Sequence, residues 1–204
     1  MRTLCYGGSF NPIHLAHLAC SKAAAMTAGF GRVLLIPAAV PPHKPDHADM
    51  PPVSIRLKMC ELAVNDDPFF VVSDIEARRE GPSFTIDTVR LLKAQGWDRV
   101  GWLLGADQLR DLLKWKEPHA VIEEADVLIM ARPGVEMDWA ALPEPFRKLR
   151  ANVVEAPLID VSSTDVRRRI KMGLPIDGLV PAPVVRFIAD CQLYRDRPDR
   201  TAKP

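Results

Sequence analysis

The chain has 204 residues, of which 48% are apolar and 26% are charged, and its formal net charge is +1. This length and composition are typical of one globular domain, and the near-neutral charge argues against a nucleic-acid-binding surface. Because no apolar run is long enough to span a bilayer, we expect no membrane partner. We expect one domain over residues 1–195 and a polar tail over residues 196–204.

Apolar runs alternate with helix-period segments along almost the whole chain. Strands are predicted over residues 2–6, 32–37, 69–73, 99–104, 127–131 and 152–155. Helices are predicted over residues 15–28, 53–64, 85–95, 107–113, 118–124, 139–148, 163–172 and 183–190. This alternation predicts an α/β fold, with a doubly wound, Rossmann-like parallel sheet and a small C-terminal helical segment. Ligands of such sheets bind at the carboxyl ends of the strands, near the point where the strand order reverses.

The four cysteines, Cys5, Cys20, Cys60 and Cys191, are widely spaced within apolar segments. This usage is typical of reduced core residues in a cytoplasmic protein and not of a disulfide framework. The segment before Gly7 is too short for a signal peptide. We therefore expect a cytoplasmic protein, whose oligomeric state, a homo-oligomer included, the sequence leaves open.

Residues 6–17 read Tyr-Gly-Gly-Ser-Phe-Asn-Pro-Ile-His-Leu-Ala-His and join the first predicted strand to the first predicted helix. The glycines predict a tight turn whose backbone amides approach a ligand, and the helix start adds positive potential for an anion. His14 and His17 project from one helical face, where both imidazoles can donate hydrogen bonds to phosphate oxygens. The pattern predicts a nucleotide phosphate site.

Other interpretations of this segment are open. The glycine pair can form a turn without a ligand, and the His-x-x-His spacing can belong to a zinc site. No further zinc ligand follows at the required spacing, and Cys5 and Cys20 are expected in the core. The pattern also differs from the dinucleotide glycine motif and from a Walker loop.

Residues 7–17 resemble the signature of the nucleotidyltransferase superfamily that carries a His-x-x-His motif. Within that superfamily, this segment is similar to bacterial nicotinate-nucleotide adenylyltransferases, which usually have Thr, Asp and Gly at the positions of Ser9, Asn11 and Ala16. The resemblance implies a Rossmann-like nucleotidyltransferase fold. It also implies an ATP site that includes Gly7, Gly8, Ser9, Phe10 and His17.

A proline-rich loop, Val-Pro-Pro-His-Lys at residues 40–44, follows the second predicted strand. The prolines stiffen the loop and hold Lys44 where its ammonium can meet a phosphate, although a solvated surface lysine is an equal alternative from the residues themselves. In the family that this chain resembles, a Pro-Pro-His-Lys segment lies beside the nucleotide phosphates. The resemblance therefore implies that Lys44 binds substrate phosphate.

Two motifs further along resemble the family's pyridine site. Residues 83–88, Ser-Phe-Thr-Ile-Asp-Thr, are similar to a segment whose threonine contacts the nicotinate carboxylate, which implies that role for Thr85. The run Gly-Ala-Asp-Gln-Leu before Trp115 resembles a substrate wall, which implies that Trp115 stacks on the pyridine ring and that Gly105 and Asp107 line the nucleotide site. The structural alternatives are a helix N-cap at Asp107 and a tryptophan half-buried against the sheet.

The last motif, Val-Ser-Ser-Thr-Asp-Val-Arg at residues 161–167, opens a predicted helix. Its hydroxyls can cap that helix while the first-turn amides bind a second anion, and Arg167 has a fork that suits phosphate oxygens. The segment matches the family's Ile-Ser-Ser-Thr-x-Ile-Arg signature, with Val161 and Val166 substituted. The resemblance implies ATP contacts by Ser162, Ser163, Thr164 and Arg167.

The resemblance implies an enzyme of NAD biosynthesis that joins ATP and nicotinate mononucleotide to give deamido-NAD and pyrophosphate. The attacking phosphate has a second pKa of about 6, so it is a nucleophile near neutral pH without a general base. Catalysis would then depend on positioning and on charge stabilisation by His14, His17, Lys44 and Arg167. We expect Mg²⁺ to bind mainly through the ATP phosphates, with no protein side chain as a ligand.

Two rival functions are open at this point. A related nucleotidyltransferase would use nicotinamide mononucleotide or phosphopantetheine as the acceptor. A non-catalytic nucleotide-binding module could dispense with groups that stabilise a leaving pyrophosphate, so the presence of all four such residues argues against it. A class I aminoacyl-tRNA synthetase fragment is disfavoured because the chain lacks a Lys-Met-Ser-Lys-Ser segment.

Overall fold

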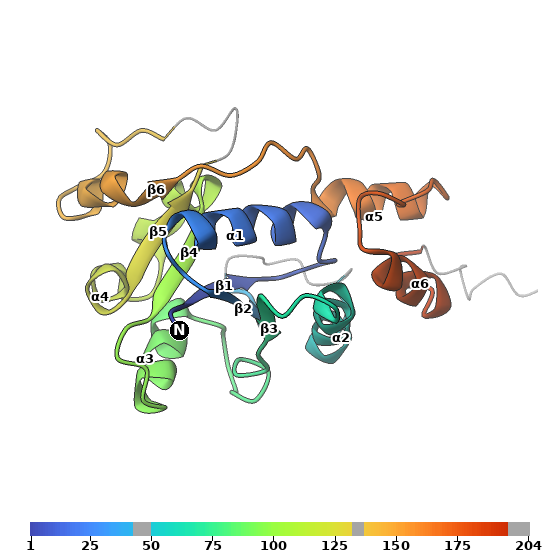
Figure 1. Ribbon diagram of the computed structural model, residues 1–204, viewed down its shortest axis with the longest axis horizontal. Helices are drawn as coiled ribbons and strands as arrows, with labels where there is room; N and C mark the ends of the chain where they lie inside the picture. The colour runs from blue at the N-terminus through green and yellow to red at the C-terminus, as the bar shows by residue number, and fades with distance from the viewer. Residues whose placement is uncertain (43–49, 132–136, 196–204) are drawn as a thin grey trace, which may run out of the picture.

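The computed structural model describes residues 1–42, 50–131 and 137–195, and its described strands form one parallel six-stranded sheet (Figure 1). The strands are β1 (Thr3–Gly8), β2 (Arg32–Pro37), β3 (Phe70–Val72), β4 (Gly101–Gly105), β5 (Asp126–Met130) and β6 (Val153–Val154). Their spatial order is β3-β2-β1-β4-β5-β6, so the direction of winding reverses between β1 and β4. The predicted doubly wound parallel sheet is confirmed, and its switch point lies between the strands that precede two of the predicted site motifs.

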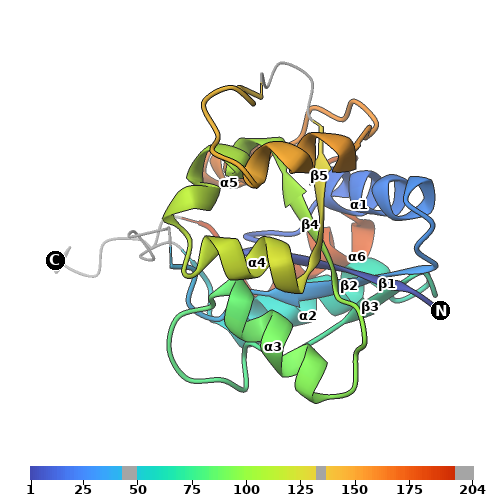
Figure 2. The same cartoon turned by 90° about the vertical axis from the view of Figure 1, so that its left-hand side faces the viewer.

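Helices cover both faces of the sheet (Figures 1 and 2). The α-helices are α1 (Leu15–Thr27), α2 (Val53–Val64), α3 (Thr85–Ala94), α4 (Pro118–Glu124), α5 (Ser163–Lys171) and α6 (Ala182–Asp190), and the 3₁₀ helices are η1 (Ala106–Lys114) and η2 (Phe146–Asn152). Successive side chains of a strand point to opposite faces, so Leu4 packs in the core with α1, α2, α5 and α6, whereas Cys5 packs with α3, α4, η1 and η2. Helix α3 lies beside α4 on that second face, as Figure 2 shows.

The first strand is longer than predicted, which corrects the expected position of the turn. Gly7 and Gly8 belong to β1, where they align with Ile36 and Pro37 of β2. A Cβ on Gly7 would lie 2.8 Å from the indole of Trp102 in β4, so the glycine is needed for close packing between strands. The left-handed backbone of the turn falls instead on Phe10, whose φ is 44°.

The predicted helix over residues 139–148 is wrong. A helix begins only at Phe146, as the short 3₁₀ helix η2. Pro143 and Pro145 stand inside the predicted range and cannot donate the backbone hydrogen bonds of a helix interior. The segment over residues 107–113 is helical as predicted but has 3₁₀ geometry over Ala106–Lys114.

The four cysteines are free, and three of them are buried as predicted. Burial raises the pKa of the Cys5 thiol to about 12, so it stays protonated at neutral pH. Cys191, which directly follows α6, is exposed, so its placement in the core was wrong. Among the described helices, none has the length and apolar character that crossing a membrane requires. The predicted tail over residues 196–204 lies outside the described residues.

Candidate active site

A polar pocket lies at the carboxyl ends of β1 and β4, next to the switch point of the sheet. It brings together the turn after β1, the two histidines at the start of α1, the start of η1 and the first turn of α5. We call it the histidine pocket. Its lining residues are Tyr6, Gly7, Gly8, Ser9, Phe10, Asn11, His14, His17, Gly105, Asp107, Gln108, Val161, Ser162, Ser163 and Thr164. The motifs predicted to bind ATP therefore share one cleft.

His14 and His17 cap the first turn of α1 reciprocally. The backbone N–H of His17 donates to Nδ1 of His14 at 3.4 Å, and the backbone N–H of His14 donates to Nδ1 of His17 at 3.2 Å. The two rings stack with their centroids 3.6 Å apart. Because each Nδ1 accepts a hydrogen bond, the proton of each neutral imidazole lies on Nε2, so each ring is an Nε2–H donor. Both residues line the histidine pocket, and their contact with a phosphate stays a prediction.

The aromatic ring of Phe10 supports this pair from the turn after β1. It is buried and meets the His17 ring edge-on, with the centroids 5.1 Å apart, and the Tyr6 ring at 5.6 Å. A left-handed backbone conformation is uncommon for a residue of this size and needs support from its surroundings. The packing of the Phe10 ring supplies that support and limits rotation of His17.

The first turn of α5 is attached to the turn after β1. Ser162 is the N-cap and accepts from the backbone N–H of Asp165 at 3.1 Å. The hydroxyl of Ser163 donates to the carbonyl oxygen of Pro12 at 2.9 Å, and Nη1 of Arg167 donates to the carbonyl oxygen of Asn11 at 2.8 Å. These two hydrogen bonds join segments far apart in the sequence, and both segments contribute lining residues to the pocket.

Arg167 does not line the histidine pocket, although the sequence motif assigns it to the ATP phosphates. Its guanidinium donates to the Asn11 carbonyl oxygen and, at 3.4 Å, to the hydroxyl of Thr164. The structure thus shows Arg167 joining α5 to the turn after β1. Its contact with a phosphate stays a prediction, and Lys44 lies outside the described residues.

A second, less polar pocket adjoins the first, and the two share Gly7, Gly8, Ser9 and Gln108. We call it the tryptophan pocket. Its other lining residues are Ala38, Pro41, Pro42, Glu76, Ser83, Phe84, Thr85, Trp102, Leu104, Trp115 and Lys116. Thr85 is the first residue of α3, whose N-cap, Phe84, has no side-chain group that caps the helix start. The two residues predicted to bind the pyridine nucleotide, Thr85 and Trp115, therefore share a cavity.

Arg56 in α2 is a functional candidate that the sequence analysis missed. Its side chain is 1% exposed, and its guanidinium donates to three backbone carbonyls, those of Ser9 at 2.8 Å, Pro51 at 3.0 Å and Ala39 at 3.3 Å. Burial lowers the pKa of Arg56 from its ordinary value. The available signal was its helical spacing, because Arg56 lies on the same face as the buried Met59 and Cys60.

Glu76 is a second buried charged residue that was missed, and it lines the tryptophan pocket. The hydroxyl of Thr88 donates to its Oε1 at 2.7 Å, and burial raises the pKa of this carboxyl above its ordinary value. Ser83, which also bonds to Glu76, accepts from the backbone N–H of Val40 at 3.2 Å. Glu76 thus helps to hold the start of α3 against the loop after β2.

Comparison with known proteins identifies the family. The cytidylyltransferase-like family model matches residues 5–169. A "Probable nicotinate-nucleotide adenylyltransferase" from Herpetosiphon aurantiacus is 41% identical over 192 residues, covering 92% of this chain and 96% of that protein. A protein of the same name from Roseiflexus sp. is 42% identical over 191 residues, covering 93% of this chain and 96% of that protein.

A solved structure has the same fold at low sequence identity. It is the Plasmodium falciparum nicotinic acid mononucleotide adenylyltransferase complexed with NaAD, with a TM-score of 0.74 and 18% identity, covering 95% of this chain and 98% of that chain. The fold is thus shared along almost the whole of both chains. Together with the family model and the two relatives, these matches show that the chain belongs to the cytidylyltransferase-like family and, within it, to the nicotinate-nucleotide adenylyltransferases.

Proposed function

We propose that this protein transfers the adenylyl group of ATP to the phosphate of nicotinate mononucleotide, giving deamido-NAD and pyrophosphate. The observation that supports this function best is the arrangement of two adjoining pockets around Gly7, Gly8 and Ser9. One pocket carries donors suited to phosphates, and the other carries aromatic and apolar walls suited to a pyridine ring. A phosphate of the second ligand would then meet the α-phosphorus of the first at the shared glycines.

The histidine pocket would bind the triphosphate. The Nε2–H groups of His14 and His17 and the first turn of α5 are donors for its oxygens. As an oxygen of the mononucleotide phosphate forms a bond to the α-phosphorus of ATP, the bond between that phosphorus and the oxygen bridging to the β-phosphorus breaks. Pyrophosphate leaves with the electron pair of that bond and carries the negative charge that develops on the oxygen. Preorganised donors stabilise that charge without having to reorganise. Because the attacking phosphate is already ionised near neutral pH, the reaction does not require a general base from the protein.

The tryptophan pocket would bind nicotinate mononucleotide. The indole of Trp115 offers a π face to the electron-poor cationic pyridinium ring. Thr85 and the first-turn amides of α3 would be donors for the nicotinate carboxylate. The positive end of the helix favours this carboxylate over the neutral carboxamide of nicotinamide mononucleotide.

The histidine pocket suits a Mg²⁺ ion that arrives with ATP. Within the described residues, no group of three His, Cys, Asp or Glu side chains is placed to hold a metal ion. Asp107 is the one carboxylate among the described lining residues, whereas the imidazole and hydroxyl groups suit phosphate oxygens. Mg²⁺ commonly uses few protein ligands and several substrate oxygens. When bound, it would neutralise charge on the leaving pyrophosphate.

A substrate panel tests the proposed function. Pyrophosphate release would be measured with ATP and nicotinate mononucleotide, nicotinamide mononucleotide or phosphopantetheine. We expect the highest kcat/KM with nicotinate mononucleotide. A preference for either of the other acceptors would show a different transferase, and no release with any of them would support the non-catalytic binding module. We further propose that the protein acts in the cytoplasm, in keeping with its four free cysteines.

Replacing Trp115 by alanine is expected to raise the KM for nicotinate mononucleotide by about fivefold, since loss of an aromatic contact commonly costs ~1 kcal/mol. The KM for ATP should stay near the wild-type value, because Trp115 does not line the histidine pocket. Steady-state kinetics with each substrate varied in turn would measure both constants. Trp115→Phe, which keeps a ring, should give an intermediate KM, and equal weakening of both substrates would contradict the assignment.

A further inference from the structure

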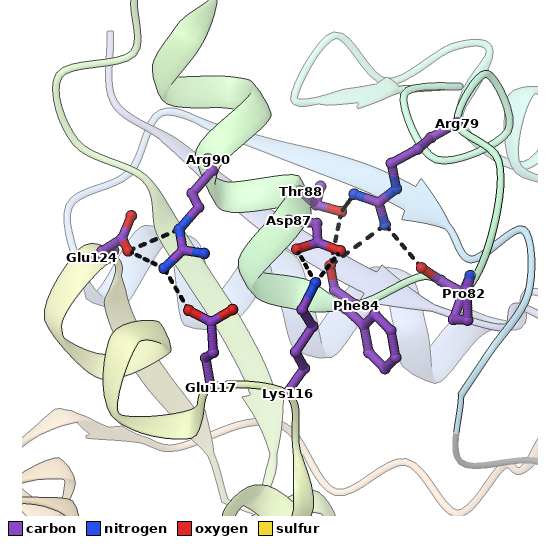
Figure 3. A network of polar contacts seen from close by, with 9 residues as sticks. All are labelled: Arg79, Pro82, Phe84, Asp87, Thr88, Arg90, Lys116, Glu117 and Glu124. Atoms are coloured by element: carbon purple, nitrogen blue, oxygen red, sulfur yellow. Dashed lines mark hydrogen bonds and ion pairs between the residues drawn. The ribbon is translucent and has the colours of Figure 1, made fainter.

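Two adjacent ion pairs attach one wall of the tryptophan pocket to α3 (Figure 3). The segment between η1 and α4 contributes Trp115 and Lys116 to that wall. Nζ of Lys116 lies 2.8 Å and 3.1 Å from the two carboxylate oxygens of Asp87. Nη2 of Arg90 lies 2.7 Å from Oε2 of Glu117. Asp87 and Arg90 are three residues apart on α3, so they face the segment from the same side of the helix.

Arg90 also contacts the far end of α4. Its Nε and Nη2 donate to Oε1 of Glu124 at 3.0 Å and 2.9 Å. One guanidinium therefore joins a carboxylate just before α4 and another in its last turn, as Figure 3 shows. The hydrogen bond from Arg90 lowers the pKa of Glu117 from its ordinary value, which keeps this carboxylate charged. A fork that binds two carboxylates restricts geometry more than a single lysine contact does.

The backbone at Glu117 is strained. Its φ of 47° and ψ of 58° lie in the left-handed region, which is unfavourable for a side chain of this kind. Pro118 follows it and disfavours the right-handed helical alternative at Glu117. Strain of this kind persists where surrounding contacts hold it, and it concentrates near ligand sites. Here the strained residue follows Trp115 and Lys116, and the contact on its own side chain is the Arg90 pair.

The opposite wall of the pocket belongs to the start of α3. Phe84 and Thr85 line it, and the ammonium of Lys116 lies over the Phe84 ring, 5.2 Å from its centroid. Asp87 and Arg90 are on the same helix as Thr85, so the two ion pairs fix the separation between the walls. Exposed ion pairs generally contribute little to global stability. Their effect here would be local, on the width of a pocket.

We propose that Arg90 is a positioning residue. Together with the Asp87–Lys116 pair, it sets the width of the tryptophan pocket by holding the Trp115–Lys116 wall against α3. This inference rests on the proposed function, because it assigns the tryptophan pocket to the mononucleotide. Arg90 does not line either pocket and acts through Glu117. Its removal should therefore change the affinity for one substrate and leave the chemical step intact.

The test is steady-state kinetics of Arg90→Met with each substrate varied in turn. We expect the KM for nicotinate mononucleotide to rise about fivefold, while kcat and the KM for ATP stay within about twofold of wild type. Arg90→Lys, which keeps the charge without the fork, should recover part of the affinity. Because Arg90 acts through Glu117, adding Glu117→Gln to Arg90→Met should raise the KM no further.

Arg99→Met is the matched control. Arg99 pairs with Asp126 at the same distance, 2.7 Å, but at the amino end of the sheet, and it lines neither pocket. The Arg99→Met variant should leave kcat and the KM values for nicotinate mononucleotide and ATP near those of the wild type. The inference is overturned if Arg90→Met leaves the KM for the mononucleotide at the Arg99→Met value, or if kcat and both KM values change together with the melting temperature. Wild-type protein that releases no pyrophosphate with nicotinate mononucleotide would refute the proposed function itself.

Discussion

Replacing His17 by alanine is expected to lower kcat by about 100-fold, as loss of one preorganised donor to a developing charge does elsewhere. The His17 imidazole lines the histidine pocket, and its Nδ1 accepts the backbone N–H of His14, which places the proton on Nε2. The alanine variant loses that donor and leaves the rest of the pocket in place. Pyrophosphate release at saturating ATP and nicotinate mononucleotide measures the change in kcat.

The His17 side chain also caps α1, so a second variant must separate the cap from catalysis. Glutamate is common at the third helical position of a capping box, because its carboxylate accepts the N-cap amide, and unlike glutamine it carries no N–H donor. His17→Glu should therefore keep the thermal stability of the wild type while its kcat stays low. If glutamate restored turnover together with stability, the imidazole would serve the cap alone, and its catalytic assignment would be wrong.

Replacing Arg56 by methionine is expected to lower the free energy of unfolding by about 3 kcal/mol, because three carbonyls lose a charged donor away from water. Those carbonyls belong to Ser9, which follows β1, and to Ala39 and Pro51, which lie at the two ends of the connection between β2 and α2. Methionine fills a similar volume, so the loss would come from the hydrogen bonds and not from a cavity. Urea denaturation at neutral pH measures the change.

A surface variant on the same helix is the control for Arg56. Lys58 is 54% exposed and pairs with Glu61 at 3.5 Å, so Lys58→Met should change the free energy of unfolding by less than ~0.5 kcal/mol. Arg56→Lys should fall between the two, since an ammonium cannot span three carbonyls in a fork. Equal stabilities of Arg56→Met and Lys58→Met would contradict the role that we assign to the buried guanidinium.

Local patterns predicted most of the elements in this protein, because each depends on residues close together in the chain. The helix start at Leu15 follows from the turn-forming residues before it, and the start of α5 at Ser163 follows from its hydroxyl-rich first turn. The pattern failed at residues 139–148, where apolar spacing suggested a helix and two prolines removed the donors that a helix requires. Trp115 and Thr85 were found by resemblance, and their shared pocket required the fold.

The sequence alone determined the alternation of strands and helices, the position of the motifs along the chain and the family to which they are similar. Only the tertiary structure showed that Gly7 lies in a strand against Trp102, that Arg56 bonds to a loop 47 residues away, and that Arg90 holds Glu117. The physical reason is the separation along the chain over which each kind of interaction acts. Helix period and turn chemistry act over a few residues, whereas these contacts exist only once the strand order β3-β2-β1-β4-β5-β6 brings distant segments together.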